Sequence, residues 1–325
     1  MQRRTLGLAI AVVTVFGAAG CGSSDSGSGG SSPSAGSKST QVKVGIIPIV
    51  DVAPLYLGQK KGFFSSRGID LKMESAQGGA AIIPGVLSDQ FQFGFSNTTS
   101  LMIAQSKGVP VKSVVNGASS NGRAGADVTG VGVKKDSPIK SARDLAGRTV
   151  AVNTLQNIGD TTVRESIRKD GGDPSEVKFV EMPFDQMPAA LDGGQVDAAW
   201  MGEPAMTIAK SQGARVVAWP FVETDPELTV ATYFTSAKLL QENPDLVRKF
   251  SEAMTESLKY ASEHPDEARQ ILTTYTKIKG DVLKNLTLPG WPAQIDMASL
   301  EKLASLGEKD GIFGGTKPDL DALFS

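Results

Sequence analysis

Few side chains that catalyse reactions or bind metals occur in this sequence of 325 residues, which has one Cys and one His. These numbers exclude an internal disulfide and a Cys/His zinc cluster, and they give no basis for a Cys-His dyad. The histidine lies in Glu263-His264-Pro265-Asp266, a predicted turn between helices, so we expect no Ser-His-Asp triad. The composition thus argues against hydrolytic or metal chemistry, and we expect no metal and no cofactor.

The length and charge of the chain favour two lobes and a small-molecule partner. The 325 residues exceed the ~100–200 typical of one domain, and 40% of them are hydrophobic, enough for a sizeable core. Basic and acidic residues number 33 and 35, for a net charge of −2. Without a polybasic tract, nucleic acid is not an expected partner.

The N-terminus is predicted to be a signal peptide, residues 1–20. A short basic start precedes an apolar run at 6–17, which is shorter than the ~20 residues that span a bilayer. Ala18-Ala19-Gly20-Cys21 resembles the lipobox that bacterial signal peptidase cuts before the thiol is lipidated. We therefore expect a lipid on Cys21 and a location at the outer face of the bacterial cytoplasmic membrane or in the periplasm.

The segment after Cys21 is predicted to be a tether, residues 21–41. Between 22 and 40, 14 of 19 residues are Gly or Ser. The segment therefore has too few apolar side chains to form a folded core. A flexible chain of this length reaches about 25 Å, so the folded body would stay close to the membrane.

From Val42 onward, short β-rich segments alternate with helical ones, which indicates an α/β protein with a mostly parallel sheet. The predicted strands are 42–48, 70–75, 91–97, 111–116, 130–134, 149–153, 177–182, 197–201 and 215–219. A gapless match at a shift of 105 residues places 103–109 opposite 208–214. The same unit is therefore predicted to occur twice, once in each lobe.

Two such lobes bring the carboxyl ends of their strands to a common crevice, where open sheets bind ligands. The repeat places Asn97-Thr98 opposite Gly202-Glu203, each at a strand end where a helix begins. Free N–H groups at helix starts favour anionic or hydrogen-bond-accepting ligand groups. The candidate ligand-binding residues are Asp51, Val52, Ala53, Asn97, Thr98, Thr99, Arg123, Asn153, Thr154, Gly202 and Glu203.

Five short motifs occur in this order: Lys61-Gly62-Phe63-Phe64, Gly68-Ile69-Asp70-Leu71, Lys135-Asp136-Ser137-Pro138-Ile139, Asp144-Leu145-Ala146-Gly147-Arg148 and Gly194-Gln195-Val196-Asp197-Ala198. Taken together, they resemble the solute-binding proteins of ABC importers for nitrate, sulfonate, taurine and thiamine pyrimidine. The resemblance implies a two-lobed periplasmic-binding-protein fold of type II with two hinge crossovers.

The crossovers would lie near 126–129 and 223–230. Lobe 1 would comprise 42–126 and 229–325, and lobe 2 would comprise 127–228. Helices would follow Tyr233 at 244–260, 265–276 and 296–310. The resemblance also implies a monomer that delivers its solute to an ABC permease and its ATPase.

For several of these residues an ordinary structural role competes with ligand binding. Glu203 suits a helix start, and Asp51 and Arg123 could be solvated loop residues. Arg123 is the most plausible cation for an anionic solute. Trp291 could cover the cleft but is expected to plug a lobe surface, and Trp200 is expected to be core.

Three functions stay open at this point. The first is a receptor for a small organic anion or zwitterion, such as a sulfonate, taurine or a carboxylate, with a pyrimidine thiamine precursor as the alternative. A sensor lipoprotein with the same fold cannot be distinguished by sequence. An enzyme is disfavoured, because pyrimidine synthases and porphobilinogen deaminases of similar fold need cysteines that this chain lacks.

Overall fold

The computed structural model describes residues 39–278 and 280–324, and its strands form two five-stranded sheets. The orders are β2-β1-β3-β10-β4 in the first sheet and β7-β6-β8-β5-β9 in the second. The first sheet consists of β1 Thr40–Ile46, β2 Ile69–Ser75, β3 Phe93–Asn97, β4 Val111–Ser119 and β10 Thr229–Ser236. The second consists of β5 Thr129–Val133, β6 Thr149–Val152, β7 Lys178–Glu181, β8 Ala198–Gly202 and β9 Arg215–Ala218.

Both sheets are mostly parallel, as predicted, but each contains one antiparallel strand that the prediction did not include. β1 pairs in parallel with β2 and β3, whereas β10 is antiparallel to β3 and β4. In the second sheet, β5 is antiparallel to β8 and β9. β5 and β10 are the first strands after each passage between the sheets. Each enters at the end where its neighbours finish and therefore runs against them.

The repeat seen in the sequence corresponds to one topology used twice. β3 Phe93–Asn97 and β8 Ala198–Gly202 are related by a shift of 105 residues, and the helices that follow them end at Ser106 and Ser211. In both sheets an antiparallel strand lies between this strand and the next. In the first sheet that strand is β10, which follows all five strands of the second sheet in the sequence.

The strand β10 is the main element that the sequence pattern missed. Residues 223–230 were predicted to be a crossover with helices following Tyr233, but β10 runs from Thr229 to Ser236. All eight of its residues are buried, so the strand lacks the polar alternation that marks a half-exposed strand. β1 also begins at Thr40, inside the predicted tether.

The helices connect and cover the sheets. They are α1 Ala53–Lys61, α2 Gly79–Leu87, α3 Thr98–Ser106, α4 Ile158–Lys169, α5 Met187–Asp192, α6 Ala205–Ser211, α7 Pro220–Thr224, α8 Ala237–Glu242, α9 Pro244–Glu263, α10 Pro265–Ile271, α11 Gly280–Asn285, α12 Met297–Lys309 and α13 Leu320–Phe324. The helices predicted at 244–260, 265–276 and 296–310 correspond to α9, α10 and α12. No helix within 39–278 or 280–324 is long and apolar enough to cross a membrane.

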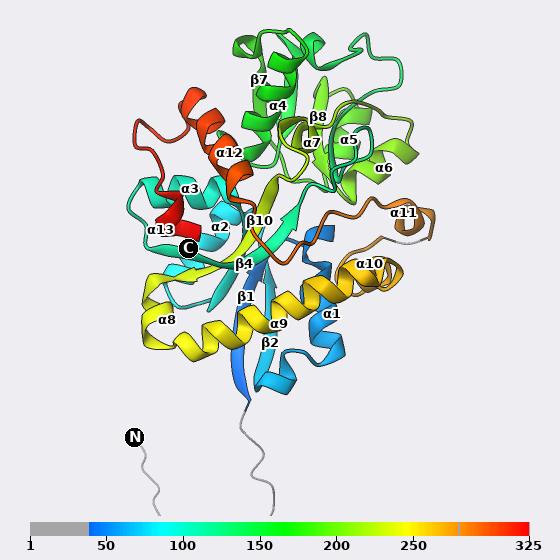
Figure 1. Cartoon of the computed structure of the whole chain (residues 1–325). Coiled ribbons are helices and arrows are strands. Elements are labelled where there is room, and N and C mark those ends of the chain that lie inside the picture. The colour runs from blue at the N-terminus through cyan, green and yellow to red at the C-terminus, as the bar shows by residue number, and fades with distance from the viewer. Residues whose placement is uncertain (1–38, 279, 325) are drawn as a thin grey trace, which may run out of the picture. The chain divides into compact units, whose positions relative to one another are not determined.

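The long helix α9 crosses the first-sheet half of the molecule beside α1 (Figure 1). Asn243 caps it by accepting a hydrogen bond from Leu246 N at 3.1 Å, and Pro244 occupies its first turn. A Cβ on Gly58 of α1 would lie 1.9 Å from Ser257 Oγ of α9. Glycine therefore sets the close approach of these two helices.

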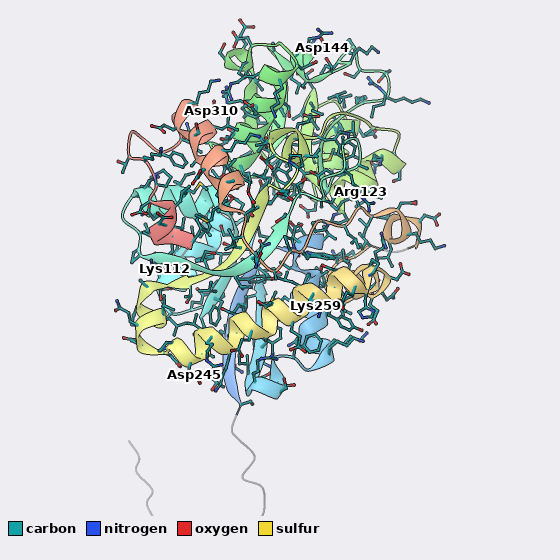
Figure 2. The ribbon with its side chains drawn as sticks, in the orientation of Figure 1. Lys112, Arg123, Asp144, Asp245, Lys259 and Asp310 are labelled. Carbon is teal, nitrogen blue, oxygen red and sulfur yellow. The ribbon has the colours of Figure 1, made fainter. Side chains whose placement is uncertain are left out.

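A buried ion pair joins α12 to α4, far from α9. Arg168 of α4 pairs with Asp310, which directly follows α12 and lies at the end of that helix nearest to α4 (Figure 2). The side chains are 18% and 5% exposed. Burial raises the pKa of Asp310, and Arg168 opposes that rise. This pair links a helix next to the second sheet with the C-terminal helices.

Candidate functional site

A small cavity, here called the inter-sheet cavity, lies where the parallel strands of both sheets end. Its volume is about 40 Å³, and each sheet half contributes half of its lining. The lining residues are Ile47, Ile49, Asp51, Phe95, Asn97, Val230 and Ala231 from the first half and Thr129, Asn153, Ile158, Phe184, Trp200, Gly202 and Phe221 from the second.

The inter-sheet cavity is nearly closed in this conformation. One water needs ~10–15 Å³, and small-molecule sites usually measure ~300–1,000 Å³, so 40 Å³ admits waters but no organic solute. Larger hollows of about 320 and 540 Å³ lie elsewhere, beside Lys134 and beside Ser119. Access for a solute therefore requires the two walls of the inter-sheet cavity to separate.

Hydrogen bonds between the two halves hold the walls together. Asn157 Nδ2 donates to Ser100 Oγ at 3.0 Å, which connects the starts of α4 and α3. Val50 N donates to Glu203 O at 3.4 Å, which connects the loop after β1 to the segment before α6. Opening the cavity must break these contacts, each of which is a single hydrogen bond of modest net strength.

Asp51 places a buried carboxyl group on the wall of the inter-sheet cavity. The residue is 7% exposed and lies in a short 3-10 turn, Val50–Val52, directly before α1. Within the described chain, the hydrogen bond to its carboxylate comes from its own backbone N–H. The pKa of Asp51 is raised to about 7, mainly by burial and to a smaller extent by the nearby charge of Asp127, while its own backbone hydrogen bond opposes the rise. This carboxyl group therefore changes its charge near neutral pH.

Two aromatic side chains fix the loop that carries Asp51. Trp291 Nε1 donates to Asp51 O at 3.2 Å, and Tyr275 Oη donates to Ile49 O at 3.0 Å. Tyr275 in turn stacks on Tyr56 with ring centroids 4.0 Å apart. Trp291 is buried and is not among the residues lining the cavity, so it supports the loop without contributing to the cavity wall.

Trp200 lines the inter-sheet cavity from the second half, although its sequence position favoured a purely core role. Its ring packs edge-on against Phe221 and contacts Phe184, both of which also line the cavity. A Cβ on Gly159 would lie 2.9 Å from this ring, so glycine lets the start of α4 rest on the indole. Trp200 Nε1 is buried and has no hydrogen-bond partner among the described residues.

The start of α3 contributes Asn97 to the cavity. Asn97 Oδ1 accepts a hydrogen bond from Ser100 N at 2.8 Å and so caps the helix. The Thr98 hydroxyl lies 3.2 Å from Thr229 O and 3.3 Å from Val230 O, which joins α3 to β10. Thr98 and Thr99 are both buried and are not among the lining residues.

The equivalent point of the second half presents Gly202 to the cavity but turns Glu203 away from it. Glu203 Oε2 accepts from Thr207 N at 3.0 Å, and Oε1 accepts from Thr207 Oγ1 at 2.8 Å. Oε1 also accepts from Thr287 N at 3.3 Å. Burial raises the pKa of Glu203, while these donors oppose the rise. The carboxylate thus connects α6 to the chain that follows α11.

The remaining candidates lie at different depths. Asn153 lines the cavity, and Thr154 follows it close to Gly78 of the first half. Val52 and Ala53 are core residues outside the lining. Arg123 is exposed in the passage from β4 to β5 and lies outside the lining (Figure 2). Cys21 lies outside the described residues.

Sequence reasoning missed most of the apolar lining. Phe95 and Ile158 follow the ordinary pattern of buried strand and helix residues, so nothing local marks them as site residues. Phe184 and Phe221 lie in loops or short helices after strands of the second sheet, which is a signal that could have identified them.

The comparison with known proteins agrees with this architecture. A family model described as NMT1/THI5 like matches residues 49–268. A putative aliphatic sulfonates-binding protein of Bacillus subtilis is 24% identical over 287 residues, covering 86% of this chain and 81% of its own. A formylaminopyrimidine-binding protein of Halalkalibacterium halodurans is 22% identical over 224 residues, covering 68% of this chain and 65% of its own.

A solved structure confirms the predicted fold class. The alkanesulfonate-binding protein SsuA from Xanthomonas axonopodis pv. citri, bound to MOPS, aligns with a TM-score of 0.75 at 15% identity. The alignment covers 87% of this chain and 98% of that one. The relatives named here are binding proteins, not enzymes. With the family model matching more than half of its length, the chain belongs to the NMT1/THI5-like family.

Proposed function

We propose that the protein is the extracytoplasmic solute-binding component of an ABC importer and performs no chemistry itself. It captures a small organic anion or zwitterion, of the sulfonate, taurine or carboxylate kind, in the inter-sheet cavity. The observation that carries this proposal is the cavity lined equally by two halves of repeated topology. The sulfonate-binding relative supports the choice of solute.

A pyrimidine thiamine precursor is the second candidate solute. Four aromatic side chains, Phe95, Phe184, Trp200 and Phe221, line the inter-sheet cavity and offer flat apolar surface to a ring. The formylaminopyrimidine-binding relative supports this alternative.

We take residues 42–126 with 229–325 as lobe 1 and residues 127–228 as lobe 2, each around one sheet. The connections at 120–128 and 219–228 then serve as hinges, and the hydrogen bonds between Asn157 and Ser100 and between Val50 and Glu203 act as closing contacts. A monomer that closes on its solute in this way would present both lobes to a permease.

Solution measurements test the receptor function. A thermal-shift screen of nitrate, taurine, alkanesulfonates, aromatic carboxylates and aminopyrimidines is expected to identify a stabilising compound. A ligand at 100 times its dissociation constant adds about 2.7 kcal/mol to the unfolding free energy. Small-angle scattering with that compound is then expected to show a smaller radius of gyration. Equal curves with and without a saturating ligand would contradict closure.

Membrane attachment is proposed to come from a lipid on Cys21, after removal of residues 1–20, with the Gly/Ser segment as a tether. Cys21→Ser in the full chain is expected to move the protein from the membrane fraction to the soluble fraction. Mass spectrometry of the wild-type N-terminal peptide should find the acyl group. A wild-type peptide without acyl mass would contradict the anchor.

A further inference from the structure

The inter-sheet cavity has a negative electrostatic character. Asp51 lines it, and Asp127, which is 1% exposed, lies near enough to raise the pKa of Asp51. None of the lining residues in the described chain is Lys, Arg or His. A purely anionic solute would therefore meet a carboxyl group and no compensating cation in this conformation.

The two carboxyl groups differ in what they can do for a solute. Asp127 accepts hydrogen bonds from Ser120 Oγ at 2.7 Å and from the backbone N–H groups of Asn121, Val128 and Val222 at 3.0, 2.7 and 2.9 Å. Its oxygens are occupied, so it acts through its charge. The Asp51 carboxylate accepts only from its own backbone within the described chain, and it is 93% buried by residue exposure.

The groups around Asp51 do not supply the missing donor. Trp291 and Tyr275 donate to backbone carbonyls of the loop, at Asp51 O and Ile49 O. The Tyr233 hydroxyl is buried without a partner in the described chain, and its pKa is raised mainly by burial and further by the charges of Asp51 and Tyr56. The titratable groups that interact electrostatically with Asp51 are thus Asp127, Tyr233 and Tyr275, and none is a cation.

We propose that Asp51 is the specificity-determining residue of the site and binds a cationic or N–H-donating nitrogen of the solute. This inference rests on the proposed function and selects, among its solutes, those that carry an amino group. On the opposite wall, Trp200 Nε1 provides an unpartnered neutral donor, and the aromatic rings accept an apolar or flat body. A zwitterion or an amino-heterocycle satisfies both walls, whereas a sulfonate without an amino group leaves Asp51 unpaired.

Matched compounds test the role of the amino group. The probes are taurine against ethanesulfonate, benzylamine against benzoate, and 4-amino-2-methylpyrimidine against 2-methylpyrimidine, measured by calorimetry near pH 8, where Asp51 is ionised. In at least one pair, the amino compound is expected to bind at least about tenfold more tightly than its partner. The reason is that its amino group adds a charge-assisted hydrogen bond to Asp51. Its affinity is expected to fall about tenfold between pH 8 and pH 6, as Asp51 becomes protonated.

Two variants separate this role from a general charge effect. Asp51→Asn is expected to weaken the amino compound about tenfold or more, and Asp136→Asn, which removes an exposed carboxylate, is expected to leave its affinity unchanged. Circular dichroism checks that both variants are folded. The wild-type pH dependence keeps the proposal testable without any variant.

The outcomes distinguish this inference from the receptor function. If ethanesulfonate or benzoate binds and no amino compound does, the assignment of Asp51 is overturned while the receptor function stands. If Asp51→Asn changes the dissociation constant of the amino compound by no more than about twofold, or ~0.4 kcal/mol, the assignment of Asp51 is also overturned. If none of these compounds, and none in the wider screen, stabilises the wild-type protein, both proposals fail.

Discussion

Replacing Asp51 with Asn is expected to raise the unfolding free energy of the solute-free protein near pH 8 by about 4 kcal/mol. The pKa of this carboxyl group rises from 3.8 to about 7 on folding because the folded protein buries it. Each pKa unit corresponds to about 1.4 kcal/mol, and the ionised form is the one that burial penalises. Denaturant titrations of both proteins near pH 8 measure the difference.

The stabilisation by Asp51→Asn is expected to increase with pH. Well below pH 3.8 the carboxyl group is neutral in both the folded and the unfolded protein, so the substitution is expected to have no effect through charge. As the pH rises from about 4 to 7, the unfolded protein loses the proton first, and the wild-type protein becomes less stable. Asp136→Asn, at an exposed position, is the control and should change little. A pH-independent difference would contradict the burial cost.

Replacing Arg168 with Ala is expected to lower the unfolding free energy by about 3–5 kcal/mol near pH 7. The substitution leaves Asp310, whose side chain is 5% exposed, without its cation, and an unpaired buried charge is strongly destabilising. The loss should shrink in acid, where Asp310 takes up a proton, because burial already raises its pKa. Denaturant titration at two pH values measures both effects.

An exposed ion pair in the same protein provides the matched control. Arg248 of α9 pairs with Asp245 and Glu252, and the Arg248 and Asp245 side chains are both 58% exposed. Arg248→Ala is expected to cost about 0–1 kcal/mol, as solvent screens such pairs. Equal losses in the two variants would contradict a special contribution from the buried pair. The double variant Arg168→Ala/Asp310→Ala should recover part of the loss.

Asp51→Asn is thus expected to stabilise the solute-free protein and to weaken binding of the amino compound. Asp51 would then serve binding at the expense of stability. A carboxyl group that costs the solute-free protein several kcal/mol and that binds the solute's nitrogen has an evident reason to remain. Arg168 and Asp310 show the contrasting case, because each carries the partner that its burial requires.

The repeat made much of the fold predictable from the sequence. Nine strands lie close to their predicted positions, because short β-rich runs bounded by Gly and Pro are local signals. β10 was missed because it is buried on both faces and its pairing with β3 and β4 is long-range. β10 also makes the first sheet mixed, as β5 does the second, and no local pattern encodes these strand directions.

The candidate site was predictable in position but not in side-chain direction. Asn97 and Gly202 follow from the repeat, and both line the inter-sheet cavity. Glu203 occupies the expected helix start, yet its carboxylate bonds to Thr207 and Thr287, and the second of these partners lies 84 residues away. From sequence alone, Asp51 looks like a solvated loop acid, because the contact of its loop with Trp291 spans 240 residues.

The position of β10 also governs how the molecule can be made. During synthesis β3 and β4 are complete long before the strand that separates them, since the whole second sheet is made in between. The first sheet is therefore the first whose strands are synthesised and the last to be complete. Until Ser236 has emerged, two strand edges lie open where β10 belongs, and open edges are where chains pair wrongly. The first sheet thus stays incomplete until β10 is made, which would suit the export proposed for this protein, because an exported chain is threaded unfolded.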